Sequence, residues 1–217
     1  MDVIIMTDVG IRLGRREVLR DVSLRVPEGE SHALVGANGS GKSVLLRLMC
    51  RLLEPSSGRV DIARQFMLQG RRAPVDFGIV IDGPAVMPYR SGIDNLRYLA
   101  GIRDRIGEEE IGRWMVKLGL DPASTQPVRQ YSQGMKQRLA LAQALMEDQK
   151  VLLLDEPFNA LDRDGVRQVK DLLAQRLAAG VTIVFTSHID ADVSELAARR
   201  WVVEGGTVTE EPVTEQP

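Results

Sequence analysis

Short apolar runs alternate with longer amphipathic stretches along most of this chain. Residues 3–10 and 23–27 have the spacing of strands, and a basic turn at residues 14–16 joins them. Residues 31–35 form a short apolar run that leads directly into a glycine-rich loop. Apolar residues then recur at helical spacing through residues 42–53. The first third of the chain therefore predicts two strands, followed by a strand, a loop and a helix.

The middle of the chain has a different character. Residues 78–81 predict another short strand, after which prolines and glycines mark loops. Residues 93–99 and 108–118 have helical spacing, and Gly119 is a good stop for the second helix. We therefore expect a mostly helical lobe over about residues 84–130.

The last third returns to alternating strands and helices. Strands are predicted at residues 151–154, 181–185 and 201–204, and helices at residues 135–146, 166–179 and 189–198. Strands this apolar, alternating with helices, imply a mainly parallel sheet covered on both faces. The expected fold is α/β, with an antiparallel β region at the N-terminus and the helical lobe inserted within a domain of residues 1–205. The acidic residues 206–217 are expected to be a disordered tail.

Composition narrows the possible functions. The formal net charge of −2 over 217 residues does not suit nucleic-acid binding, which usually requires a strongly basic domain. The sequence shows no signal peptide and no apolar run long enough to span a bilayer. Any role at a membrane would therefore depend on a partner.

The glycine-rich loop predicts a phosphate site. Its sequence matches the pattern G-x-x-x-x-G-K-[ST], and it follows a strand and opens a helix, as the mechanism requires. Glycines allow consecutive backbone N–H groups to surround a phosphate, and the helix N-terminus adds partial positive charge. Lys42 would reach the β- and γ-phosphates, and the Ser43 hydroxyl would bind Mg²⁺. The remaining loop residues assigned to the nucleotide are Gly36, Asn38, Gly39, Ser40 and Gly41.

A second apolar strand ends in two acids, Asp155 and Glu156. Carboxylates at this position lie at the carboxyl edge of a parallel sheet, where such folds bind ligands. Asp155 is placed to hold Mg²⁺. Glu156 is placed to orient or deprotonate an attacking water. With the glycine-rich loop, this strand predicts a P-loop NTPase core that binds ATP and Mg²⁺.

Three further motifs indicate one particular family of P-loop NTPases. The segment from Ser132 to Arg138 resembles the ABC signature, Asp162 ends a segment like the D-loop, and His188 ends one like the H-switch. The motifs follow one another in the same order as in the family that carries the ABC signature. With the P-loop, they cover about residues 1–205. The chain thus resembles the nucleotide-binding domain of an ABC transporter.

The resemblance implies how the motifs act. Two such domains, here expected to be identical, pair head to tail and sandwich ATP. Ser132 and Gly134 would face the ATP held by the partner, in agreement with the preference of a helix N-terminus for anions. Ser132 can also be a plain N-cap. Asp162 would contribute to the nucleotide site, and His188 would contact the γ-phosphate and hold Glu156, although a lone histidine is often merely structural.

Two positions depart from the family pattern. Leu13 stands where an aromatic residue commonly stacks on adenine, so we expect weaker or less base-selective binding. Asp82 stands at the Q-loop glutamine. Asp82 could reach Mg²⁺ or the attacking water as a catalytic or metal-binding group, or it could be a solvated loop carboxylate.

The leading functional hypothesis is a transport ATPase at the cytoplasmic face of the cell membrane, bound there by separate transmembrane permease subunits. The acid at position 82 and the S-x-G-M-K-Q-R form of the signature lean towards exporters of the drug, peptide or antibiotic-resistance kind. The alternative is a soluble ABC ATPase that acts in cytosolic assembly without a membrane partner.

Overall fold

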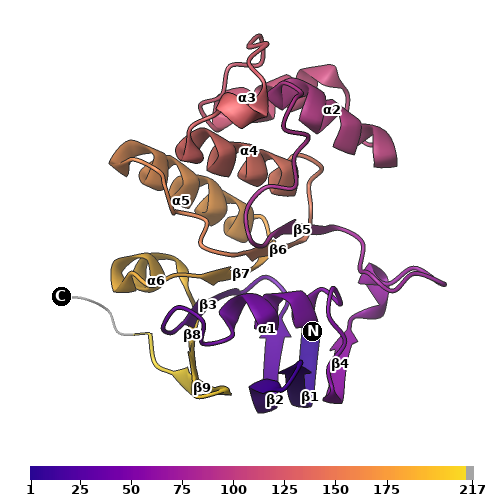
Figure 1. Cartoon of the computed structure of the whole chain (residues 1–217), viewed down its shortest axis with the longest axis vertical. Coiled ribbons are helices and arrows are strands. Elements are labelled where there is room, and N and C mark those ends of the chain that lie inside the picture. The colour runs from indigo at the N-terminus through magenta and orange to yellow at the C-terminus, as the bar shows by residue number, and fades with distance from the viewer. Residues whose placement is uncertain (214–217) are drawn as a thin grey trace.

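The computed structural model describes residues 1–213 and arranges its strands in two sheets (Figure 1). The first sheet is antiparallel, with the order β2-β1-β4, and consists of β1 (Asp2–Leu13), β2 (Arg16–Pro27) and β4 (Ser57–Ile62). The second sheet consists of β3 (Ser31–Val35), β5 (Phe77–Val80), β6 (Val151–Leu154), β7 (Thr182–Thr186), β8 (Arg199–Glu204) and β9 (Thr207–Glu211).

The second sheet has the order β5-β6-β7-β3-β8-β9, and every neighbouring pair is parallel except β8 with β9. This arrangement confirms the predicted fold class, a mainly parallel sheet with an antiparallel β region from the N-terminus. The helices are α1 (Lys42–Met49), α2 (Gly92–Arg103), α3 (Glu108–Lys117), α4 (Gln133–Leu145), α5 (Arg163–Ala178) and α6 (Asp190–Leu196).

The larger sheet is buried on both faces, which explains why its strands are continuously apolar. Leu152 and Leu154 of β6 face a core that includes residues of helices α2 to α5. Val151 and Leu153 of the same strand face a second core shared with α1 and the antiparallel sheet. This alternation follows from the two-residue period of a strand. The site described below lies at the edge of this double-sided layer.

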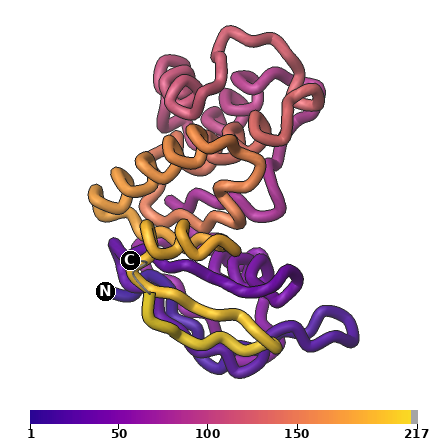
Figure 2. The backbone as a smooth tube through the Cα atoms, turned by 90° about the vertical axis from the view of Figure 1, so that its left-hand side faces the viewer, coloured from indigo at the N-terminus to yellow at the C-terminus, as the bar shows by residue number. Residues whose placement is uncertain are grey.

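The helical segment between β5 and α4 lies at one end of the molecule, and the antiparallel sheet lies at the other (Figure 2). Helices α2 and α3 pack on each other and on α4. Helix α4 in turn approaches β5 closely at Gly78, where a Cβ atom would lie 2.0 Å from the carbonyl oxygen of Ala144. A glycine at this position therefore lets the helical layer sit directly on the sheet.

Two local predictions need correction. Helix α1 ends at Met49 and not at residue 53, because Arg51 adopts a left-handed conformation with a φ of 57°. The tail expected to be disordered from residue 206 includes a strand, β9, which pairs with β8. Its acids meet basic partners across the pair, since Glu210 accepts a hydrogen bond from Arg199. Residues 214–217 of the predicted tail lie outside the described residues.

Strand β4 was not predicted at all. Gly58, Arg59 and Asp61 make this short segment polar, and only Val60 and Ile62 face the core. Pairing with β1 determines its conformation, and sequence periodicity carries no signal of that pairing. Within residues 1–213, each helix is too short or too polar to cross a membrane.

Candidate nucleotide-binding site

The glycine-rich loop connects the end of β3 to the start of α1. Gly36 has a φ of 147°, and a Cβ atom there would lie 2.3 Å from the carbonyl oxygen of Val203 in β8. Gly41 has a φ of 115° and directly precedes α1. Between them, the Ser40 N–H donates to the Ala37 carbonyl over 3.1 Å and closes a turn. The loop therefore needs glycine where the backbone is left-handed or crowded.

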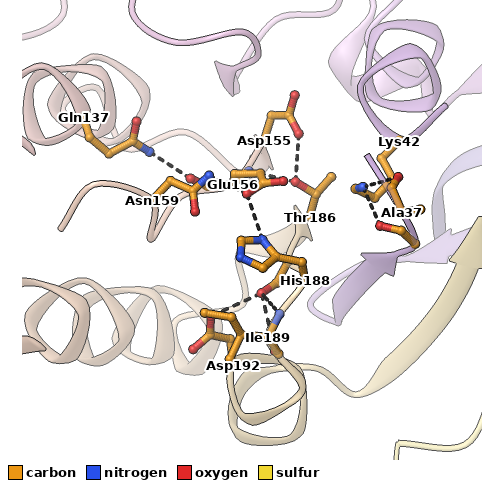
Figure 3. Close-up of polar contacts among 12 residues, drawn as sticks. Ala37, Lys42, Gln137, Asp155, Glu156, Asn159, Thr186, His188, Ile189 and Asp192 are labelled. Atoms are coloured by element: carbon orange, nitrogen blue, oxygen red, sulfur yellow. Dashed lines mark hydrogen bonds and ion pairs between the residues drawn. The ribbon is translucent and has the colours of Figure 1, made fainter. Parts of the chain in front are cut away.

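Lys42 lies under this loop with only 6% of its surface exposed. Its Nζ donates hydrogen bonds to the carbonyl oxygens of Gly36, at 2.7 Å, and Ala37, at 3.1 Å (Figure 3). These bonds hold the ammonium group at the helix N-terminus. The positive charge of the ammonium and the partial positive charge of the helix end together favour an anion there. The lysine and the loop thus form a prearranged site for phosphate.

One hydroxyl group holds the two acids at the end of β6. Thr186, at the end of β7, is fully buried, and its Oγ1 donates to Asp155 Oδ1 over 2.7 Å. The same oxygen accepts the backbone N–H of Glu156, also over 2.7 Å (Figure 3). Adjacent parallel strands therefore fix the acids relative to each other.

The Glu156 carboxylate faces the H-switch loop. Its Oε2 lies 3.1 Å from His188 Nδ1 and also accepts a hydrogen bond from Asn159 Nδ2. Glu156 has a left-handed backbone with a φ of 49°, an uncommon conformation for a residue with a side chain. The structure thus brings Glu156 and His188 together, and the contact of His188 with a γ-phosphate stays a prediction.

A cleft with a cavity volume of about 440 Å³ joins the loop, the acids and the first hairpin. Ser43 and Asp155 share its wall, and hydroxyl and carboxylate oxygens are ligands that Mg²⁺ accepts when phosphates supply the rest. Leu13 lines the same cleft and remains 44% exposed, and its contact with a base stays a prediction. The lining residues are Leu13, Arg16, Val18, Asn38, Gly39, Gly41, Lys42, Ser43, Val44, Asp155 and Glu156.

The signature segment lies at the N-terminus of α4. Ser132 is the N-cap, and its Oγ accepts the Met135 N–H over 3.1 Å. A Cβ atom on Gly134 would lie 2.7 Å from the Ala160 carbonyl of the D-loop. Both residues are absent from the cleft lining given above. They remain candidates for contact with a nucleotide on a second subunit.

Asp162 caps the next helix, α5, and its Oδ1 accepts the Gly165 N–H over 3.1 Å. The same oxygen accepts a hydrogen bond from Arg138 of α4. Arg138 also donates to the Leu118 carbonyl, at the end of α3. Asp162 therefore ties the D-loop to the signature helix, and its contact with nucleotide stays a prediction.

Asp82 is paired with Arg47 of α1 and has a left-handed φ of 60°. Its side chain is 58% exposed and does not contribute to the cleft lining described above. The structure therefore places Asp82 beside a cation at the far end of the phosphate-binding helix. Its role towards Mg²⁺ or water stays a prediction.

Sequence reasoning assigned no role to several residues of the site. Thr186 and Asn159 lie within the motifs, but only their contacts with Asp155 and Glu156 show what they do. Gln137 of α4 donates to the backbone carbonyls of Glu156 and Pro157, at 3.2 and 3.1 Å (Figure 3). The available signal was position alone, since all three residues lie within the motif segments.

Thr186→Val is expected to lower kcat for ATP hydrolysis about tenfold, because it leaves the Glu156 N–H and the Asp155 carboxylate without their shared partner. Thr182→Val is the matched control. Thr182 lies in the same strand and is equally buried, and its hydroxyl accepts the Gly29 N–H, far from the acids. Steady-state kinetics should separate the two variants, while thermal unfolding should show similar losses. Equal kcat values would contradict the role of Thr186.

Known proteins share these features. Residues 19–159 match the family described as ABC transporter. An uncharacterized ABC transporter ATP-binding protein of Bacillus subtilis, YdbJ, is 33% identical over 92% of this chain, which spans 66% of that relative's length. The lantibiotic transport ATP-binding protein SrtF of Streptococcus pyogenes is 34% identical over 85% of this chain and 79% of its own length.

The fold is also that of a solved ATP-binding cassette, a dimer in a post-hydrolysis state bound to ADP and phosphate. The TM-score is 0.84, with 22% identity, over 98% of this chain and 100% of the other. The motifs, their geometry and the family match agree with one another. The chain therefore belongs to the ABC transporter family and is one of its ATPase domains.

Proposed function

We propose that this chain is the ATP-hydrolysing subunit of an ABC exporter and acts as a dimer bound to separate membrane subunits. The observation that carries the proposal is the cleft in which Ser43, Asp155 and Glu156 converge with the buried Lys42. These residues supply a phosphate-binding cation, two oxygen ligands for a metal and a base. No other described cleft combines a lysine at a helix N-terminus with two adjacent acids.

Each residue has a defined task in hydrolysis. The loop N–H groups and Lys42 bind the phosphates and balance the charge that spreads over the transferred group. Glu156 orients a water in line with the γ-phosphate and accepts its proton. His188, hydrogen-bonded to Glu156, keeps that carboxylate turned towards the water. Ser43 and Asp155 would hold Mg²⁺, which neutralises phosphate charge when bound.

A second copy of the chain completes the site. The N-terminus of α4, with Ser132 and Gly134, is the anion-favouring surface that would meet the γ-phosphate bound by the other copy. The name of the structural neighbour describes a dimer bound to ADP and phosphate, which supports pairing of this kind.

A groove between β5 and α2 suits the membrane subunit. Phe77, Leu99 and Ile102 give it apolar surface, and Ile102 is 68% exposed. Arg103 and Gln143 lie in the same groove, where Arg103 is paired with Asp76 and Glu147. The relative named for lantibiotic transport supports an export role at the cytoplasmic face of the membrane. ATP closure of the dimer would then move the groove and the segment seated in it.

The test is a pull-down of tagged Glu156→Gln chain from detergent-solubilised native membranes, with ATP and Mg²⁺ present to trap the closed dimer. We expect a polytopic membrane protein at comparable stoichiometry, which wild-type chain should recover as well. Recovery of a soluble dimer alone, with both wild-type and variant, would overturn the transport role in favour of a cytosolic ABC ATPase.

A further inference from the structure

An ion pair is buried behind the H-switch loop. Lys170, in the middle of α5, lies 2.9 Å from Asp192 of α6, and their side chains are only 10% and 6% exposed. Burial opposes the charge of Lys170, yet hydrogen bonds to Glu195 and Asp192 raise its pKa above the ordinary value. Lys170 is therefore charged at neutral pH.

Such a pair is a poor source of stability, because removing both charges from water costs about as much as their attraction returns. The pair can instead fix the position of a polar group that is hydrogen-bonded to it. Asp192 Oδ2 accepts the Ser187 hydroxyl over 3.2 Å (Figure 3). Ser187 directly precedes His188, and its Oγ also accepts the Ile189 N–H over 3.1 Å. The pair thus reaches the backbone on both sides of His188.

His188 depends on this backbone for its orientation. Its side chain is 54% exposed, so packing does not hold the ring. Within residues 1–213, the His188 imidazole makes one hydrogen bond, to Glu156. Thr186, two residues earlier, is anchored to Asp155, and Ser187 is anchored to Asp192. The loop is therefore fastened at consecutive residues immediately before the histidine.

We propose that Lys170 and Asp192 are positioning residues that fix the H-switch loop through Ser187, so that His188 reaches Glu156. This inference rests on the proposed role of His188 in hydrolysis. The N-cap of helix α5 is Asp162, which is bonded to the signature helix. The same helix therefore carries the D-loop at its start and the anchor of the H-switch in its middle.

Histidine NMR tests the positioning directly, without any nucleotide. The chain contains two histidines, so histidine-selective ¹⁵N labelling of the full chain gives one ring pattern for each. His32 is 1% exposed, and its burial lowers its pKa to about 4, so it stays neutral at pH 7 and reports an intact fold. Glu156→Gln provides the reference pattern for a His188 ring that has lost its carboxylate partner.

Lys170→Met and Asp192→Asn are expected to move the His188 ring signals towards this reference and to leave His32 unchanged. Ser187→Ala should do the same, and it leaves the buried ion pair intact if either charge variant fails to fold. Glu195→Gln is the matched control, since Glu195 also binds Lys170 but is 59% exposed. It should keep the wild-type His188 pattern.

Measuring kcat and KM distinguishes a failure of this inference from a failure of the proposed function. Lys170→Met should lower kcat about ten- to a hundredfold with little change in KM, and Lys170→Arg should recover most of it. In a His188→Ala background, Lys170→Met should have no further effect, because it acts through that histidine. Unmoved His188 signals in a folded Ser187→Ala chain would overturn the inference. Moved signals with unchanged kcat would uphold the positioning and overturn the role of His188 in hydrolysis.

Discussion

Glu156→Gln is expected to reduce kcat for ATP hydrolysis by about two to four orders of magnitude while ATP binding is retained. The change keeps the shape of the side chain and removes the group that accepts a proton, a contribution of this size in general base catalysis. The amide can still contact His188 and Asn159, which hold the carboxylate in the wild-type chain. Stopped hydrolysis with bound ATP should also favour the closed dimer.

Single-turnover hydrolysis, ATP titration and size-exclusion chromatography with ATP and Mg²⁺ together measure these effects. Glu54→Gln is a suitable control, because Glu54 is an exposed acid outside the cleft. Its kcat should equal that of the wild-type chain. A Glu156→Gln chain that hydrolyses ATP at the wild-type rate would show that another group takes the proton.

Lys42→Met is expected to weaken ATP binding about ten- to a hundredfold. Methionine keeps most of the apolar stem and removes the ammonium, and a hydrogen bond to a charged group is worth about 1.5–3 kcal/mol. The loop itself should also loosen, since Lys42 Nζ is bonded to the carbonyls of Gly36 and Ala37. Both losses act on the same phosphate site.

Calorimetric titration with a non-hydrolysable ATP analogue gives the affinity directly. Lys150→Met serves as the comparison, because Lys150 is 57% exposed and pairs with the nearby exposed Asp148, outside the cleft. It should bind the analogue as the wild-type chain does. An unchanged Kd for Lys42→Met would mean that the loop N–H groups alone carry the phosphate.

The parts of the site that were predictable from sequence are those set by local chemistry. A loop that wraps a phosphate needs left-handed residues at fixed spacing, so Gly36, Gly41 and Lys42 could be read in order. Strand β6 was found with its observed bounds, because burial on both faces leaves a continuous apolar run. Its final acids followed from the same reasoning.

Contacts between distant segments could not be predicted in this way. The partner of Asp82 is Arg47 in α1, and neither residue type nor spacing identifies it. Strand β9 was mistaken for a disordered tail because its acids are favourable only beside Arg199 and Arg200 of β8. The bridging hydroxyl of Thr186 likewise depends on the pairing of β6 with β7.

Gln137 gives the subunit a further property. Gln137 extends from α4, the helix that would meet the nucleotide of the neighbouring subunit. Its side chain binds the backbone of Glu156, which would act on the nucleotide bound by the same subunit. Gln137 thus joins the two half-sites of one chain, beside the bond from Arg138 to Asp162. In the proposed head-to-tail dimer each subunit would carry this bond, so a shift of the Glu156 backbone would be passed to the surface that faces the neighbour's nucleotide.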